Sequence, residues 1–528
     1  MGQQANLYGP PGSGKTRKLV GIAESVVYER GAQALGAVTF TRTAAFELKQ
    51  RLAPIVGAQH HPNLDLVFPH VGTIHSLCYR LIGRPKVITN AMRREWALSV
   101  GDREAKFNGP ERPEWLDTYD VGMDRLDQSY ASATLAILGS ARQQMIPLED
   151  AWRRFRGHDQ ILPPLERVER LAKSYTDYKH EEQVIDFEDM LEMGRDERLR
   201  VPFMVVDEAQ DNSALLWSVI QSWRRDIDYT WAAGDPWQSI FRFNGADPSL
   251  FRNQPGKWQT IDDSHRLTGE SADIALEILR RGGYGDDPLL GSWKGVGPGQ
   301  VTDGTSFHLA RTGALVELLA DALIEMGTPF SYLSGRKGPL GAEATAGWRA
   351  AQELINEGSA QAQAILAFVK GLKKGSLNPP DQKWIEFVAR EDPTRRVEMS
   401  ELPWAGAVEL LQKRLPNHGY FSRVVQGYGQ GALVMPPAAR VGTIHSAKGR
   451  EADHVYLVRN WGTLPGRAMQ DGDQGEVCVA YVGASRHRVG LTLLDPPGVR
   501  YGIDYPFPVE GSTRYSMDAR GQILTEAL

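Results

Sequence analysis

Short apolar runs that end at glycine, acidic or hydroxyl residues recur along the chain and predict buried β-strands. They occupy residues 5–8 (ANLY), 36–40 (GAVTF), 203–206 (FMVV) and 229–235 (YTWAAGD). A helical pattern follows the first run over residues 15–30. Residues 307–335 combine a strand, a helix and a second strand, which is a βαβ unit typical of a parallel sheet. The pattern therefore predicts an α/β protein.

Other stretches are helical and lack strands. Residues 141–152 (ARQQMIPLEDAW) predict a helix, a break at Pro147 and a new helix. Residues 360–374 (AQAQAILAFVKGLKK) and 405–415 (AGAVELLQKRL) are also helical in pattern. These stretches predict helical subdomains inserted between the strand-rich parts.

Composition sets the class of protein. A chain of 528 residues is too long for one core and fits about two to four domains. No window approaches about 18 uninterrupted apolar residues, so we expect no membrane span and an intracellular protein. Cys78 and Cys478 each lie in an apolar run, which favours buried packing over a disulfide or a zinc site. The net charge of -5 argues against a general polyanion-coating protein but permits a locally positive groove.

Residues 9–16 (GPPGSGKT) match the phosphate-binding loop G-x-x-x-x-G-K-[ST]. Glycines let the backbone N–H groups curl around phosphate oxygens, Lys15 supplies a positive charge and Thr16 a hydroxyl for Mg²⁺. A strand before the loop and a helix after it place the helix N-terminus at the phosphates. We expect the nucleotide to contact the loop residues Gly9, Pro10, Pro11, Gly12, Ser13, Gly14, Lys15 and Thr16.

Residues 203–211 (FMVVDEAQD) supply the second half of a nucleotide site. Asp207 and Glu208 follow a strand at the edge where parallel sheets bind ligands. Asp207 can hold Mg²⁺, and Glu208 can orient or deprotonate the attacking water. Together with the loop, the pair predicts an enzyme that hydrolyses ATP with Mg²⁺.

The order of further motifs resembles the superfamily 1 DNA helicases of the UvrD/Rep/PcrA type. After the phosphate loop come residues 37–52 (AVTFTRTAAFELKQRL), 71–82 (VGTIHSLCYRLI), 184–191 (VIDFEDML) and 207–211 (DEAQD). Residues 232–247 (AAGDPWQSIFRFNGAD), 261–270 (IDDSHRLTGE), 441–451 (VGTIHSAKGRE) and 479–488 (VAYVGASRHR) follow. The resemblance implies two RecA-like parallel-sheet lobes, each with a largely helical insertion.

The resemblance also assigns nucleotide-site roles. Gln238 would sense the γ-phosphate, and Arg266 and Arg486 would act as arginine fingers, with Arg486 the stronger candidate. Arg17 and His265 would stack on the adenine, and Glu451 would lie near the ribose. In this family an upstream glutamine segment reads the adenine edge, and only eight residues precede the loop here. We therefore expect looser discrimination between ATP and other nucleotides.

Single-strand contacts follow from the same motifs, because such motors combine aromatic platforms with polar phosphate contacts. The sequence VGTIHS occurs at residues 71–76 and again at 441–446, as if two related lobes each offered one phosphate contact. Asn244 stands where the resembled family has an Arg, and Arg242 could take over the strand contact of that Arg. The expected strand contacts are Phe40, Thr41, Thr73, His75, Arg242, Phe243, Asn244, Thr443 and His445.

The motifs divide the chain into lobes and insertions. The first lobe takes residues 1–75 and 185–257, with a helical insertion at 76–184. The second takes residues 258–335 and 436–496, with a reduced insertion at 336–435. Residues 497–528 form a tail that reads as poor in strands.

The favoured function is an ATP-dependent helicase that moves 3′ to 5′ on single-stranded DNA and unwinds duplex at single-strand/duplex junctions, in replication or repair. One alternative is a translocase, or the motor subunit of a nuclease or repair complex, with little unwinding alone. Another is a nucleotide-gated DNA-binding switch. We expect a monomer in isolation, with no membrane partner.

Overall fold

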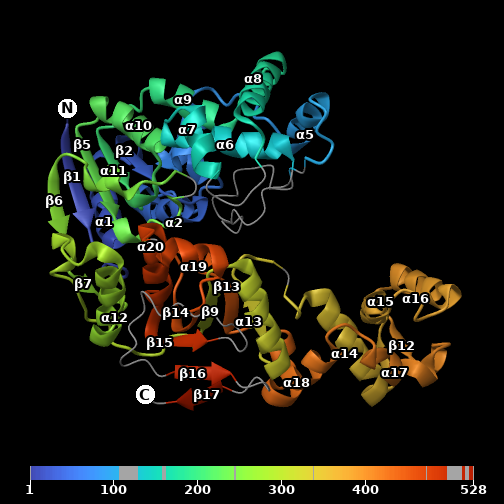
Figure 1. Ribbon diagram of the computed structural model, residues 1–528. Helices are drawn as coiled ribbons and strands as arrows, with labels where there is room; N and C mark the ends of the chain where they lie inside the picture. Colours follow the sequence, from blue (N-terminus) through green and yellow to red (C-terminus); the bar gives the residue numbers. More distant parts are fainter. Residues whose placement is uncertain are drawn as a thin grey trace. The chain divides into compact units, whose positions relative to one another are not determined.

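The computed structural model describes residues 2–105, 107, 129–156, 162–242, 245–336, 338–470, 472–495, 514–517 and 523–526. It is a mixed α/β protein, and Figure 1 labels most of its helices and strands. The chain forms two compact units. The first comprises the described residues of Met1–Gly299 and Arg467–Val489, and the second those of Gln300–Gly466, Gly490–Asp504 and Val509–Leu528.

A six-stranded sheet organises the first unit. Its order is β3 (Val71–Gly72), β2 (Leu35–Val38), β4 (Phe203–Val206), β5 (Tyr229–Gly234), β1 (Gln3–Tyr8) and β6 (Lys257–Thr260). Every neighbouring pair is parallel. The carboxyl ends of all six strands therefore meet at one edge, where parallel sheets bind ligands.

Helices follow the strands of this sheet. α1 (Lys15–Arg30) follows β1, and its bounds confirm the helix predicted from the sequence. The first unit also contains α2 (Arg42–Leu52), α3 (Leu64–Val67), α4 (Ile74–Leu81), α9 (Phe187–Asp196), α10 (Ala214–Trp223), α11 (Pro248–Arg252), α12 (Gly269–Leu279) and α20 (Gln474–Ala484). The interior strands β1, β2, β4 and β5 bury their central residues, which explains why they appear in the sequence as continuous apolar runs.

A helical segment is inserted between α4 and α9. It contains α5 (Asn90–Ser99), α6 (Tyr130–Gln144), α7 (Leu148–Arg156) and α8 (Leu165–Glu181). The predicted helix break at Pro147 lies between α6 and α7 and is confirmed. A core of its own forms around Trp96 and Tyr175, whose rings meet edge to face at 4.9 Å.

The second unit contains a seven-stranded sheet in the order β10-β13-β9-β14-β15-β16-β17. Its strands are β9 (Ser306–Ala310), β10 (Phe330–Tyr332), β13 (Ala439–Thr443), β14 (Ala452–Val458), β15 (His487–Asp495), β16 (Arg514–Met517) and β17 (Ile523–Glu526). With α13 (Gly313–Met326), β9 and β10 form the predicted crossover, and β13 lies between the two strands.

Five helices lie between β10 and β13 in the described chain: α14 (Ala342–Glu357), α15 (Ala362–Gly371), α16 (Pro379–Glu391), α17 (Val408–Lys413) and α18 (His418–Tyr428). A small antiparallel pair, β11 (Ser359–Gln361) and β12 (Arg396–Glu398), joins them. Apolar residues of these helices share one continuous core with β9, β10 and β13. α19 (Thr463–Gln470) follows β14.

Two sequence expectations differ from this structure. The C-terminal tail contains β16 and β17, so the expectation of few strands there is wrong. These strands pair backbone to backbone at the sheet edge, and such pairing needs no long apolar run. The proposed lobe boundary at 257/258 falls inside β6, which completes the first sheet beside β1.

Candidate active site

The phosphate loop lies between β1 and α1 at the carboxyl edge of the first sheet. Gly12 (φ 74°) and Gly14 (φ 86°) have left-handed backbones that favour glycine, so the loop can curl before the helix begins. No side chain caps α1, which leaves its first N–H groups available to an anion. The Lys15 ammonium donates to the carbonyl oxygens of Gly9 at 2.7 Å and Pro10 at 3.1 Å.

The segment after β6 supports this loop from the other side. The Ser264 hydroxyl donates to the Pro11 carbonyl at 2.6 Å, and the His265 N–H donates to the Gly12 carbonyl at 3.0 Å. A Cβ on Gly12 would lie 2.3 Å from the Cβ of Arg266, so only glycine fits there. The structure therefore brings His265 and Arg266 to the phosphate loop.

Thr16 and Asp207 form the candidate magnesium site. The Thr16 hydroxyl donates to the Asp207 carboxylate at 2.9 Å, although the two residues are 191 positions apart. Burial, followed by the charge of Glu208, raises the pKa of Asp207 to about 6. A carboxylate whose charge is disfavoured in this way would be stabilised by a divalent cation, so these oxygens fit Mg²⁺.

Glu208 follows Asp207 with a left-handed backbone (φ 49°), which is uncommon for a residue other than glycine. Its carboxylate accepts a 2.6 Å hydrogen bond from the Gln210 amide. The Gln210 carbonyl oxygen accepts the Asp235 backbone N–H at 3.0 Å. Gln210 is fully buried and thus joins the ends of β4 and β5.

A second set of contacts continues from Asp235 to Arg486. The Gln238 amide donates to the Asp235 carboxylate at 2.8 Å, and the Tyr481 hydroxyl donates to it at 3.0 Å. Arg486, 2% exposed, donates to the Gln238 amide oxygen at 2.9 Å. The polar network therefore runs from Glu208 through Gln210, Asp235 and Gln238 to Arg486.

Burial controls the charges in this network. Burial lowers the pKa of Lys15, while Asp235, Glu208 and Asp207 oppose that change. Burial also raises the pKa of Asp235, while the Lys15 charge and the hydrogen bonds from Gln238 and Tyr481 lower it. The positive charge of Lys15 is therefore stabilised only by nearby carboxylates and loop carbonyls, and the phosphates of a bound nucleotide would stabilise it further.

The candidate strand-binding residues lie at the ends of neighbouring strands. The Phe40 ring stacks on Phe241, with centroids 5.5 Å apart and planes 12° from parallel. Thr41 and Thr73 accept backbone N–H groups at the starts of α2 and α4. His75 is 5% exposed, and burial followed by the Arg42 charge lowers its pKa to about 4, so it is neutral at physiological pH.

The repeated VGTIHS sequence forms the same threonine–serine hydrogen bonds at both positions, although an α-helix follows the first copy and a short 3-10 turn follows the second. The Ser76 N–H donates to the Thr73 hydroxyl oxygen at 3.3 Å, and the Ser446 N–H donates to that of Thr443 at 3.2 Å. Each serine hydroxyl also donates back to the threonine carbonyl, at 2.9 and 2.8 Å. A Cβ on Gly72 or Gly442 would collide with that serine oxygen, which explains the glycine in both copies.

Several candidates are not brought to the nucleotide loop by any described contact. Arg17 is exposed on α1. Glu451 and His445 belong to the second unit, so their roles remain predictions. Phe243 and Asn244 lie outside the described residues.

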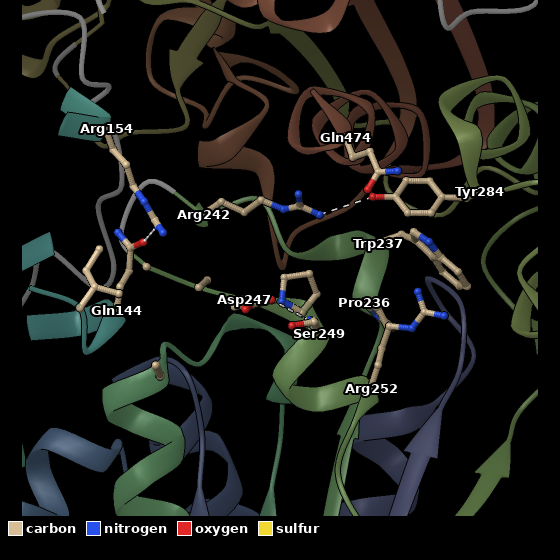
Figure 2. A pocket seen from close by; sticks show the side chains of 15 residues that line it. Gln144, Arg154, Pro236, Trp237, Arg242, Asp247, Ser249, Arg252, Tyr284 and Gln474 are labelled. Atoms are coloured by element: carbon tan, nitrogen blue, oxygen red, sulfur yellow. Dashed lines mark hydrogen bonds between the residues drawn. The ribbon is translucent and has the colours of Figure 1, made fainter. Parts of the chain in front are cut away.

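Arg242 and Arg450 have contacts that the sequence did not suggest. Arg242 donates to the Tyr284 hydroxyl at 3.4 Å (Figure 2). It also donates to the Cys478 sulfur at 3.8 Å. Arg450, where the resembled family has Leu, donates to the Leu333 carbonyl at 2.8 Å and so anchors its loop to the end of β10.

The sequence analysis missed Gln210, Asp235, Phe241, Ser264 and Tyr481 as parts of this site. Each of the contacts that Phe241, Ser264 and Tyr481 make at this site has a partner far away in the chain, so spacing carries no signal for those pairings. All five fall inside the motif segments that carry the family resemblance. A buried polar residue within such a motif was the available signal for Gln210 and Asp235.

The site has the features that define the P-loop NTPase class. They are a glycine-rich loop at the start of a helix, a hydroxyl–carboxylate pair that can hold Mg²⁺, and a second carboxylate that can activate water. Residues 1–258 match the family model described as UvrD/REP helicase N-terminal domain. This part of the chain is therefore similar to the N-terminal domain of UvrD/Rep helicases, and the resemblance given by its motifs is confirmed.

Curated relatives agree with this assignment. The chain is 27% identical over 291 residues to the putative ATP-dependent DNA helicase YjcD of Bacillus subtilis, covering 50% of this chain and 35% of that protein. It is 26% identical over 253 residues to the ATP-dependent DNA helicase PcrA of the same organism, covering 45% and 31%. One of the subunits of an ATP-dependent helicase/nuclease from Alkaliphilus oremlandii is 28% identical over 138 residues, 24% of this chain and 11% of that protein. The chain thus spans about a third of the length of the first two relatives.

Two other features of the described residues bear on the sequence predictions. None of their helices is both long and apolar enough to cross a membrane. Cys78 and Cys478 are free and buried, as predicted.

Proposed function

We propose that the protein is an ATP-driven DNA motor that moves 3′ to 5′ along a single strand and separates duplex at single-strand/duplex junctions. The observation that carries the proposal is the network that joins Glu208 to Arg486. A switch that only binds nucleotide has no need of a water-activating carboxylate connected to an arginine finger. DNA as the substrate rests on the relatives named as ATP-dependent DNA helicases.

In this mechanism the loop and Lys15 bind the phosphates of ATP, and Thr16 and Asp207 would hold Mg²⁺, which would neutralise charge on the phosphates. Glu208 accepts a proton from the water that attacks the γ-phosphorus. The bond to the β,γ-bridging oxygen breaks, giving ADP and inorganic phosphate. Arg486 leaves Gln238 for the developing charge on the phosphoryl oxygens.

Coupling to DNA would pass through residues 235–241. Asp235 and Gln238 belong to the polar network that runs from Glu208 to Arg486, which we call the hydrolysis network. Phe241 lies three residues after Gln238, and its ring stacks on that of Phe40. A base inserted at this aromatic pair would shift the same short segment that orients Gln238. Movement of the segment therefore offers a direct route between strand binding and hydrolysis.

We further propose that the six-stranded and seven-stranded sheets are the centres of two RecA-like lobes, with helical insertions at residues 76–184 and 336–435. The separate core around Trp96 and Tyr175 supports the first insertion. The second insertion shares its core with the neighbouring sheet, which favours a rigid attachment.

The experiment measures ATP turnover with and without single-stranded DNA, then strand displacement on duplexes with 3′ or 5′ overhangs. We expect turnover to rise with DNA and displacement to need the 3′ overhang. Turnover that ignores DNA would overturn the motor. The Glu208→Gln variant should bind ATP and fail to hydrolyse it; retained hydrolysis would overturn the role of Glu208.

A second candidate is the motor component of a nuclease complex, with little unwinding alone. The similarity to the helicase/nuclease of Alkaliphilus oremlandii favours it. DNA-stimulated turnover without strand displacement from either overhang would select this candidate.

A further inference from the structure

His487 directly follows Arg486, the arginine that the proposed mechanism brings to the transferred phosphoryl group. It is the first residue of β15 and is fully buried. Its Nε2 and the Ser271 hydroxyl share a 2.7 Å hydrogen bond, although the two residues are 216 positions apart. A buried imidazole is costly without such a partner, so this bond holds the start of β15 against α12.

The hydrogen bond from His487 leads toward Arg266. Thr268 caps α12 by accepting the Ser271 N–H at 3.3 Å, and its hydroxyl donates to the Ser271 hydroxyl oxygen at 3.0 Å. Thr268 lies two residues after Arg266 in the chain. His487, Ser271 and Thr268 therefore form a continuous line of hydrogen bonds between the segments that carry the two arginines.

The backbone of Arg266 is fixed by close packing. The Gly297 N–H donates to the Leu267 carbonyl at 2.8 Å, and a Cβ on Gly297 would lie 2.5 Å from the Arg266 carbonyl oxygen. Gly12 of the phosphate loop is similarly close to the Arg266 Cβ. Arg266 has little room to move, so loss of the His487 bond would displace Arg486 instead.

We propose that His487 is a positioning residue for ATP hydrolysis, because its bond to Ser271 fixes Arg486 relative to Arg266 and the phosphate loop. The inference rests on the proposed function, in which Arg486 stabilises the charge that develops on the phosphoryl oxygens. Such a group is effective only when it is held in place before the reaction, and a displacement of about 1 Å can cost about a hundredfold in rate. His487 acts through Arg486.

A histidine that only stabilised the core would show the same hydrogen bond, so the test compares kcat with KM. His487→Leu keeps a side chain of similar volume and removes the bond. Steady-state ATP turnover is measured with and without oligo(dT). We expect kcat to fall about ten- to a hundredfold, while KM for ATP stays near wild type because Lys15 and the loop are untouched.

His454 offers a matched control. Its Nε2 and the Thr492 hydroxyl also share a 2.7 Å hydrogen bond, and both residues belong to the second unit. His454→Leu should lower the melting temperature, as His487→Leu does, and should keep the wild-type kcat. Equal falls of kcat in the two variants would trace the effect to lost stability and would overturn the proposal.

Two further variants test the bond itself. The amide of His487→Gln can still bond the Ser271 hydroxyl, so this variant should recover most of the lost kcat. Ser271→Ala deletes only a hydroxyl and removes the same bond from the other side, which keeps the test valid if His487→Leu does not fold.

A double-mutant cycle then asks whether the two residues act through one interaction. Ser271→Ala alone should lower kcat as His487→Leu does, and the double variant should show no further loss. Losses of kcat that multiply in the double variant would mean that the residues act independently, and the proposal would fall.

The outcomes separate this inference from the proposed function. A wild-type kcat in folded His487→Leu or Ser271→Ala would overturn the positioning role and leave the motor intact. Wild-type turnover that DNA does not stimulate would overturn the motor, and the same comparison of kcat would then decide the role of His487 in basal hydrolysis.

Discussion

Gln210 links Glu208 to the rest of the hydrolysis network, because its side chain connects Glu208 to the end of β5. Its amide donates to Glu208 at 2.6 Å and to Asp211 at 3.2 Å, and its oxygen accepts the Asp235 N–H at 3.0 Å. A Cβ on Gly234 would lie 2.4 Å from that oxygen, so the amide packs directly against the backbone of β5. Gln210→Leu preserves the approximate volume and removes all three hydrogen bonds.

The expected effect has two parts. The buried Asp235 N–H loses its acceptor, which costs about 1–3 kcal/mol of unfolding free energy. Glu208 loses a charge-assisted hydrogen bond of about 1.5–3 kcal/mol that fixes its orientation. If that orientation matters in the transition state, kcat falls about ten- to a hundredfold, and ATP affinity changes little because Lys15 and the loop are untouched.

Gln254→Leu is the matched control. Gln254 is also buried, accepts from Arg224 at 2.6 Å and donates to the Leu250 carbonyl at 2.6 Å, and these bonds lie outside the hydrolysis network. Both variants should lose stability, but only Gln210→Leu should lose DNA-stimulated kcat at saturating ATP. A Gln210→Leu protein that is destabilised like the control and keeps wild-type kcat would refute the relay from Glu208 to Asp235.

Three further predictions concern the loop, the metal site and the aromatic pair. Lys15→Ala should abolish ATP turnover, because the Lys15 ammonium, which here bonds two loop carbonyls, is the cation available to the phosphates of ATP. Undiminished hydrolysis would disprove the assignment of the loop. Asp207→Asn should stabilise the nucleotide-free protein, because a folded-state pKa of about 6 against about 3.9 unfolded makes ionisation of Asp207 costly. The cost of ionising Asp207 is absent below about pH 4, grows as pH rises and is complete above about pH 6. The free energy of unfolding should therefore be higher in Asp207→Asn than in wild type by at most about 3 kcal/mol at about pH 8, and by near zero at about pH 4. Chemical unfolding at the two pH values measures this difference, and equal stability of the two proteins at the higher pH would contradict the prediction. Phe40→Leu should weaken single-strand binding about five- to a hundredfold by removing a stacking face worth about 1–3 kcal/mol, with ATP affinity in the absence of DNA as the control; unchanged strand affinity would exclude Phe40 as a platform.

Local chemistry explains which features could be predicted from the sequence. α1 and the strands β1, β4 and β5 follow from apolar runs and helical periodicity, which neighbouring residues determine. The phosphate loop follows from glycines whose backbone conformations few other residues adopt. Thr16 and Asp207 could be placed together because both follow strands of one parallel sheet.

The remaining features depend on contacts between distant parts of the chain. Tyr481 reaches Asp235 across 246 positions, and Arg486 reaches Gln238 across 248. Nothing in the spacing of either pair specifies the partner. Likewise β16 and β17 are held by backbone pairing at a sheet edge, for which short mixed segments suffice.

The duplicated VGTIHS geometry has a consequence for how such a motor could acquire direction. At Thr73 and Thr443 the hydroxyl, the backbone amide and the returning serine hydroxyl are arranged alike, so in the proposed motor each place would offer a strand phosphate the same kind of grip. Two grips of the same kind do not by themselves favour forward over backward steps. In the proposed motor the bias would come from timing, because the loop, Glu208, Gln238 and Arg486 all belong to the unit that carries the first grip. A ratchet of this kind would be reversed or stalled by altering when the first grip loosens, rather than by strengthening either one.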